Sequence, residues 1–146
     1  MPFDRASVEE ALAPLFTSSL DGLTKTMPDD CEWVAVNPHP EEQYLHVAGL
    51  MNKEKVLRSI QRTQSCMSAP LEYKVQNIVI SQPGDPPCAV IEVRAWGKAK
   101  DGKDYDNTHC WVCQFEEQAG TFKMKQIRTY FDSAHLWNTL RDNSAK

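Results

Sequence analysis

Apolar and polar positions alternate along three consecutive runs in the last third of the chain. The runs extend from Cys88 to Lys100, from Tyr105 to Glu116 and from Phe122 to Asp132, with Asp101-Gly102 and Ala119-Gly120 between them. A period of two is typical of β-strands, and short connections that contain glycine favour hairpins. We therefore predict three strands that follow one another in an antiparallel meander.

Two further strands are predicted earlier in the chain. Leu71 to Ser81 has the composition of a long strand, and it ends at the turn-forming segment Gln82 to Pro87. Cys31 to Val36 alternates like a short strand until Asn37-Pro38 breaks it.

Helical spacing marks the segments between and before these strands. Ser7 and Glu10 form a capping-box pattern, and Pro14 predicts a kink or a restart inside the helix that follows. Asn52 is the predicted cap of a second helix. The apolar residues of the first helical region are Leu12, Leu15, Phe16, Leu20 and Leu23, and those of the second are Val56, Leu57, Ile60 and Met67.

This order of elements predicts the fold class. Helices, a strand, a helix and four consecutive strands favour an α+β fold, in which a cone-like, curved antiparallel sheet wraps around N-terminal helices and encloses a pocket. The 146 residues suffice for one domain over 1–146. The polar tail, 141–146, is expected to be frayed.

Charge and hydropathy exclude several classes of partner. The net charge is −4, and the 16 basic residues are scattered among 20 acidic ones, so no basic patch for nucleic acid is expected. The sequence has neither a run of eighteen apolar residues nor a basic and apolar leader. We therefore expect a cytoplasmic protein that binds neither nucleic acid nor membrane.

Five cysteines predict reduced thiols rather than a disulfide framework, because the count is odd and the cysteines fall inside predicted elements. Cys110 and Cys113 have the spacing of a zinc or redox pair. Residues three apart on a strand point to opposite faces, however, so these two thiols are not expected to meet. We expect no metal site and no cofactor.

The same alternation predicts which side chains share a face. One face of the second run carries His109 and Trp111 together with Asn107, Cys113 and Phe115. One face of the third run carries Gln126, Arg128, Tyr130 and Asp132. We expect these two faces to be the same side of the sheet, and a face that mixes aromatic and ionisable groups is a plausible pocket wall. For Trp96, the sequence leaves open a pocket or an interface between subunits.

The closing segment Ile127-Arg128-Thr129-Tyr130-Phe131-Asp132, together with the early Asn37-Pro38 and the element order, resembles the nuclear transport factor 2-like superfamily. Within it, the chain is most similar to the SnoaL-like polyketide cyclases and the ketosteroid isomerase group. The resemblance implies a cone-shaped fold, homodimers and a loop over the cavity. Ketosteroid isomerases have an Asp-Pro at the position of Asn37-Pro38, and an amide is no general base. The SnoaL-like cyclases instead use an Asp in a setting like Asp132-Ser133-Ala134-His135-Leu136.

These residues predict a cofactor-independent isomerase or cyclase that acts on a small hydrophobic, oxygenated metabolite, such as a polyketide or terpenoid intermediate. Asp132 and His109 would move protons, and Arg128 and Tyr130 would polarise an oxygen. The predicted substrate-binding residues are Trp33, Asn37, Tyr44, His46, Trp96, Trp111 and Trp137. The alternatives are a binding module without catalysis, or a dehydratase or epoxide hydrolase. Asp132 could equally be the N-cap of a final helix.

Overall fold

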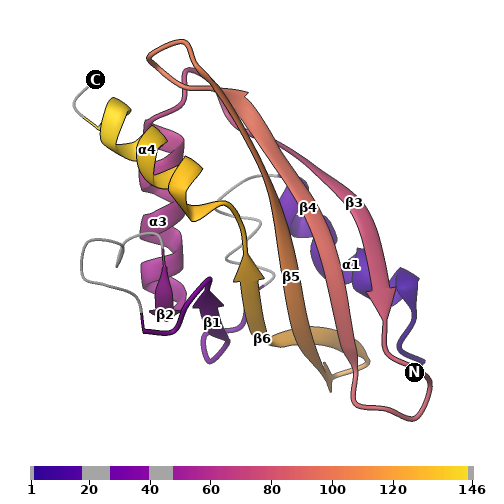
Figure 1. The fold of residues 1–146 in the computed structure, drawn as a ribbon. Coiled ribbons are helices and arrows are strands. Elements are labelled where there is room, and N and C mark those ends of the chain that lie inside the picture. Colours follow the sequence, from indigo (N-terminus) through magenta and orange to yellow (C-terminus); the bar gives the residue numbers. More distant parts are fainter. Residues whose placement is uncertain (1, 18–26, 40–47, 145–146) are drawn as a thin grey trace.

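A six-stranded, curved sheet forms the frame of the protein (Figure 1). The computed structural model describes residues 2–17, 27–39 and 48–144. The strands are β1 (Glu32–Ala35), β2 (Gly49–Met51), β3 (Glu72–Ile80), β4 (Cys88–Lys98), β5 (Asp104–Gln118) and β6 (Thr121–Tyr130). The described helices are α1 (Arg5–Thr17), α3 (Lys53–Ser65) and α4 (Ser133–Asn143).

The sheet has the strand order β2-β1-β6-β5-β4-β3. Strands β3 to β6 form the predicted antiparallel meander. Strand β1 lies parallel to β6, with Trp33 opposite Ile127, and β2 pairs antiparallel with β1. The predicted α+β fold with a curved sheet is therefore confirmed. The sheet is mixed, because the early strand β1 joins the edge of the antiparallel meander in the same direction as β6.

Local sequence signals set most element ends. The Asn52 side chain accepts a hydrogen bond from the Lys55 N–H at 2.9 Å, as predicted for the cap of α3. At the turn between β5 and β6, Ala119 and Gly120 have φ angles of 52° and 79°. Positive φ at both central residues is the signature of a two-residue type I′ hairpin.

The start of the first helix differs from the prediction. The side chain of Asp4 accepts a hydrogen bond from the Ser7 N–H at 2.8 Å, so Asp4 takes the role of the cap and Ser7 lies inside the first turn. The helix α1 runs as one element through Pro14 to Thr17. Leu20 and Leu23 lie outside the described residues.

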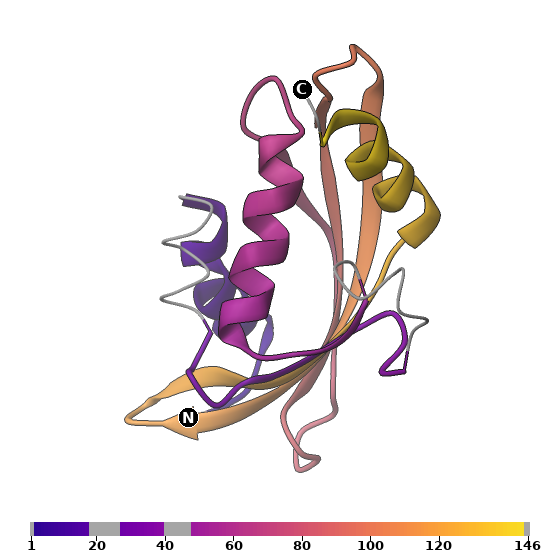
Figure 2. The ribbon, with the colours of Figure 1, turned by 90° about the vertical axis from the view of Figure 1, so that its left-hand side faces the viewer.

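The main core fills the concave side of the sheet. Figure 2 shows α1 and α3 on the same side of the curved strands. Val8 and Leu12 of α1 are buried there against the inward-facing residues of the sheet, among them Ile91, Cys113 and Ile127. The described helices α1 and α3 therefore cover the inner face of the sheet.

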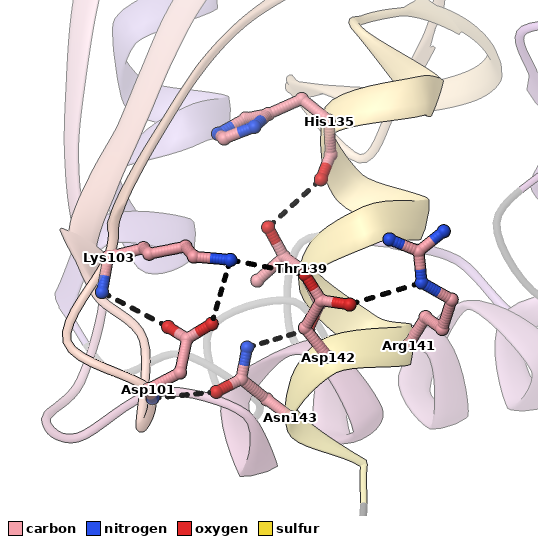
Figure 3. A network of polar contacts seen from close by, with 7 residues as sticks. All are labelled: Asp101, Lys103, His135, Thr139, Arg141, Asp142 and Asn143. Atoms are coloured by element: carbon pink, nitrogen blue, oxygen red, sulfur yellow. Dashed lines mark hydrogen bonds and ion pairs between the residues drawn. The ribbon is translucent and has the colours of Figure 1, made fainter.

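Helix α4 closes one end of the cone, and its last turn is ordered by hydrogen bonds (Figure 3). The Asp101 N–H donates to Asn143 Oδ1 at 2.8 Å, and Asn143 Nδ2 donates to the Thr139 carbonyl at 2.8 Å. Asn143 is only 2% exposed. This amide ties the end of α4 to the β4–β5 turn. The fraying expected from Arg141 onward stays a prediction.

None of the described helices has both the length and the apolar character needed to cross a membrane.

Candidate functional site

A cavity of about 130 Å³ lies between the inner face of the sheet and α3. Most of the residues around it are apolar. They are Trp33, Ala35, Met51, Val56, Ser59, Ile60, Thr63, Leu71, Tyr73, Ala95, Tyr105, His109, Trp111, Thr129, Phe131 and Leu136. An apolar hollow with a few polar groups is the usual form of a small-molecule site.

His109 on β5 is the imidazole of this cavity. Its ring stacks on Phe131, with the ring centroids 4.8 Å apart, and no other described residue forms a hydrogen bond with it. Burial lowers the pKa of His109 to about 4, because removal from water penalises the charged imidazolium. The imidazole is therefore neutral at neutral pH, with one nitrogen that donates and one that accepts a hydrogen bond.

Trp111 and Thr129 form the polar part of the same wall. They face each other as direct partners on β5 and β6, and they are 6% and 2% exposed. Within the described part of the chain, Trp111 Nε1 and Thr129 Oγ1 are buried without a hydrogen-bond partner. Buried polar groups of this kind are rare in folded proteins, so each needs an explanation.

At the α4 end of β5, Tyr105 lines the cavity and Asn107 lies beside it. Asn107 Nδ2 donates to the Asp132 carbonyl at 3.0 Å and to Tyr105 Oη at 3.3 Å. The pKa of Tyr105 is raised to about 12, chiefly because burial penalises the phenolate. His135 stacks on the Tyr105 ring at a centroid distance of 5.1 Å, so Tyr105 is held from both sides as a neutral phenol.

Arg128 and Tyr130 lie on the opposite face from His109, so the prediction that they share its face is wrong. The cause is a register shift between Gln114 and Phe115 in the pairing of β5 with β6. Phe115 is opposite Met124, whereas beyond the shift Val112 is opposite Arg128. One extra residue in one strand moves every later side chain to the other face. Tyr130 is accordingly 48% exposed.

Asp132 is the N-cap of α4. Its Oδ1 accepts a hydrogen bond from the His135 N–H at 2.9 Å, which is the alternative that the sequence left open. The residue is exposed and is not part of the cavity wall. The predicted arrangement of Asp132 and His109 across a shared cavity is therefore not present.

The predicted substrate-binding residues divide into three groups. Trp33 and Trp111 line the cavity and contact each other edge to face, with ring centroids 5.8 Å apart. Asn37 is exposed and accepts a hydrogen bond from the His39 N–H at 2.9 Å, and Trp137 on α4 lies outside the cavity wall. Tyr44 and His46 lie outside the described residues.

Trp96 is on the outer face of the sheet. The Arg94 guanidinium lies 4.6 Å from its ring centroid and forms two hydrogen bonds with the Asp106 carboxylate, at 2.9 and 2.7 Å. Trp96 thus belongs to the face away from the cavity, where exposed Val79 and Tyr130 also lie. Homodimerisation through this face stays a prediction.

The described cysteines are free thiols. Cys113 is fully buried on the inner face, and Cys110 lies on the other side of β5, as strand geometry predicts. Burial raises the pKa of Cys113 above its ordinary value and that of Cys31 to about 11, which disfavours the reactive thiolate. Among the described residues, no group of three His, Cys, Asp or Glu side chains is placed to hold a metal ion.

Five of the polar residues that line the cavity were missed from the sequence: Ser59, Thr63, Tyr73, Tyr105 and Thr129. The sequence signal for Thr129 is the spacing of apolar residues in β6. Phe122 and Met124 are two apart, but the next apolar residue is Ile127. This change of spacing indicates the extra residue that brings Thr129 to the cavity.

Comparison with known proteins supports the fold. No family model matches the chain, and no curated protein matches it. The BvnE pinacolase from Penicillium brevicompactum superimposes with a TM-score of 0.69 at 16% identity, over 100% of this chain and 98% of that one. A putative SnoaL-like polyketide cyclase from Jannaschia Sp. CCS1 gives 0.65 at 15% identity, over 96% and 94%. A hexachlorocyclohexane dehydrochlorinase (LinA) type 2 gives 0.64 at 14% identity, over 88% and 86%. The chain therefore has the fold of the nuclear transport factor 2-like superfamily.

Proposed function

We propose that the protein is an enzyme that moves a proton on a small, mostly apolar molecule with an oxygen substituent, and that His109 is the catalytic residue. The observation that carries this proposal is the imidazole of His109, which lines an apolar cavity without a hydrogen bond to another described residue. A neutral imidazole can take a proton at one nitrogen, so it is chemically able to act as a base.

The reaction that suits this site is proton abstraction from a carbon next to a carbonyl group. The C–H bond breaks, its proton goes to His109, and the electron pair passes through the carbon–carbon bond to the oxygen as an enolate. Return of the proton to a different carbon gives an isomer. Attack of the enolate carbon on a second carbonyl carbon of the same molecule gives a ring, as the π electrons of that carbonyl move to its oxygen, which takes the proton back from His109. Both outcomes keep the isomerase or cyclase class that the sequence predicts.

The low pKa of His109 is compatible with this role. Burial opposes the imidazolium in the free protein, but the enolate that forms beside it supplies a compensating negative charge. Opposite charges attract strongly in a site of low polarity, and the Trp111 N–H is available to stabilise the oxygen. Proton transfer and charge stabilisation thus occur on neighbouring positions of one strand.

The size of the cavity limits the ligand. Apolar cavities of roughly 150 Å³ hold benzene, so about 130 Å³ suits one ring with a small substituent. Similar solved structures are named as a pinacolase, a polyketide cyclase and a dehydrochlorinase. Those names are compatible with a small-molecule enzyme. Because they cover different reactions, the type of reaction proposed here is inferred from the residues of the cavity.

Deuterium exchange tests this proposal without knowledge of the natural substrate. Wild-type protein is incubated with cyclohexanone in deuterated buffer, and loss of the protons next to the carbonyl is followed by NMR. We expect exchange above the buffer rate, loss of it in His109→Gln, and no loss in the matched surface variant His39→Gln. Exchange that persists in His109→Gln would remove His109 from the mechanism.

A binding module without catalysis is the second candidate. Asp132 caps α4 instead of facing His109, so the cavity lacks the second ionisable partner that the sequence predicts. Binding of cyclohexanone without any exchange above the buffer rate would favour this candidate.

A further inference from the structure

The wall formed by Trp111 and Thr129 has two hydrogen-bonding groups that the described protein does not use. The two residues are direct cross-strand partners, both line the cavity, and both side chains carry an unpartnered buried atom, Nε1 and Oγ1. Side chains of direct cross-strand partners lie about 5 Å apart at Cβ. Two such groups on adjacent strands can therefore reach the same atom of a ligand.

The chemistry of the two groups defines that atom. An indole N–H can only donate a hydrogen bond, whereas a threonine hydroxyl can donate or accept. The atom opposite Trp111 must therefore be an acceptor, and a carbonyl or hydroxyl oxygen can bond with both groups at once. We propose that Trp111 and Thr129 form an oxygen-binding site for a neutral ketone or alcohol.

The surroundings favour a neutral ligand over an anion. No lysine or arginine side chain is among the described residues that line the cavity, and the imidazole of His109 is neutral because burial lowers its pKa. A carboxylate or phosphate would have to lose its hydration without a compensating positive charge, which is strongly unfavourable. A carbonyl or hydroxyl group carries no such cost.

The position of this site also orients the ligand relative to His109. This part of the inference rests on the proposed function. His109 and Trp111 are two residues apart on β5, so they point to the same face about 7 Å from each other. A hydrogen bond, a carbonyl group and one further carbon can span that separation. An oxygen held by Trp111 would therefore place the neighbouring carbon toward the imidazole of His109.

Binding of two probes of the same shape tests the oxygen-binding site. Cyclohexanone has a carbonyl oxygen where methylenecyclohexane has a CH₂ group. We expect wild-type protein to bind the ketone roughly tenfold more tightly, as one to two buried hydrogen bonds would give. We also expect the indole N–H resonance of Trp111, assigned by its absence in Trp111→Phe, to move downfield with the ketone and not with the hydrocarbon.

Two variants and two matched controls identify the residues. Thr129→Val is nearly isosteric, and we expect it and Trp111→Phe to reduce the ketone preference several-fold. Thr108→Val and Trp96→Phe make the same exchanges on the outer face, where Thr108 is exposed, and should leave the preference unchanged. Thermal unfolding of each variant verifies that it is folded. If Trp111→Phe does not fold, the ketone preference of Thr129→Val alone tests the site.

The proposed oxygen-binding site would be contradicted if Thr129→Val kept the wild-type preference for the ketone over the hydrocarbon. It would also be contradicted if the wild type bound neither probe. The two proposals can fail independently. If the wild type prefers the ketone but shows no deuterium exchange, the oxygen-binding site is supported and the proposed catalysis is contradicted.

Discussion

Asn107 holds the backbone of Asp132 with both ends of its side-chain amide. Its Nδ2 donates to the Asp132 carbonyl at 3.0 Å, and its Oδ1 accepts from the Asp132 N–H at 3.0 Å. This pair of hydrogen bonds fixes the point where β6 ends and α4 begins. Phe131 lies directly before that point and stacks on His109, so Asn107 sets the position of the aromatic wall against the imidazole.

Asn107→Ala should therefore destabilise the protein strongly. The change removes the two hydrogen bonds to Asp132 and the one to Tyr105, and it leaves the partly buried N–H and carbonyl groups of Asp132 without these partners. We expect the free energy of unfolding to fall by about 2 to 4 kcal/mol, measured by urea denaturation. Asn138→Ala, an exposed change on α4, is the control. A loss in Asn107→Ala no larger than in the control would show that the clamp contributes nothing.

Two substitutions of Asp132 separate a helix cap from a catalytic acid. Asparagine caps helices about as well as aspartate, whereas alanine does not. Asp132→Asn should therefore keep the stability of the wild type, and Asp132→Ala should lose about 1 kcal/mol in thermal or urea unfolding. Because the carboxylate caps α4 outside the cavity, both folded variants should keep the deuterium exchange of the wild type. A large loss of exchange in Asp132→Asn with normal stability would return Asp132 to the mechanism.

The pKa of His109 predicts how stability depends on pH. In the unfolded chain a histidine has a pKa of about 6.5, whereas burial lowers that of folded His109 to about 4. As the pH falls, the unfolded state therefore binds a proton at His109 at a higher pH than the folded state does. The contribution of neutral His109 to the free energy of unfolding is complete above about pH 6.5 and is lost as the pH falls toward about 4. Urea midpoints at pH 7.5 and 5 should show a decrease in the wild type that is smaller in His109→Gln. An equal decrease in both proteins would mean that the pKa of His109 is not lowered.

Ala119 offers a stabilising change that tests the hairpin. Its φ of 52° lies in the left-handed region, where an L-residue with an ordinary side chain is strained by about 1 kcal/mol. Asparagine tolerates this region and makes the favoured Asn-Gly pair of a type I′ turn with Gly120. Ala119→Asn should raise the melting temperature, and Gly120→Ala, at φ 79°, should lower it. A lower melting temperature in Ala119→Asn would contradict this turn type.

Elements that depend on neighbouring residues could be predicted from the sequence. The cap at Asn52 and the hairpin at Ala119-Gly120 are local features, because each depends on a few consecutive residues. The pairing of β1 with β6 could not be predicted in the same way. It places Trp33 opposite Ile127, two residues that are far apart in the chain. No local sequence pattern indicates that these two strands pair, or that they pair in parallel.

The faces of β6 show where alternation alone fails. Without a bulge, the hairpin register at Gln118 and Thr121 would continue to place Arg128 opposite Trp111, on the cavity side. The single extra residue in β6 instead brings Thr129 opposite Trp111. The composition of the cavity wall thus depends on one irregularity. It places a threonine where an arginine would lie, and the described wall has no lysine, arginine, aspartate or glutamate.

The pH dependence of deuterium exchange tests the central claim most directly, because the rate with dilute cyclohexanone reports the ionisation of the free enzyme. The quantity to follow is the exchange rate of the wild type minus that of His109→Gln. If neutral His109 is the base, this difference should be constant from pH 8 to about 5.5. It should then fall toward half its value near pH 4, the pKa of the buried imidazole. A rate that rises between pH 6 and 8, or a profile that His109→Gln leaves unchanged, would contradict the assignment of His109 as the group that moves the proton.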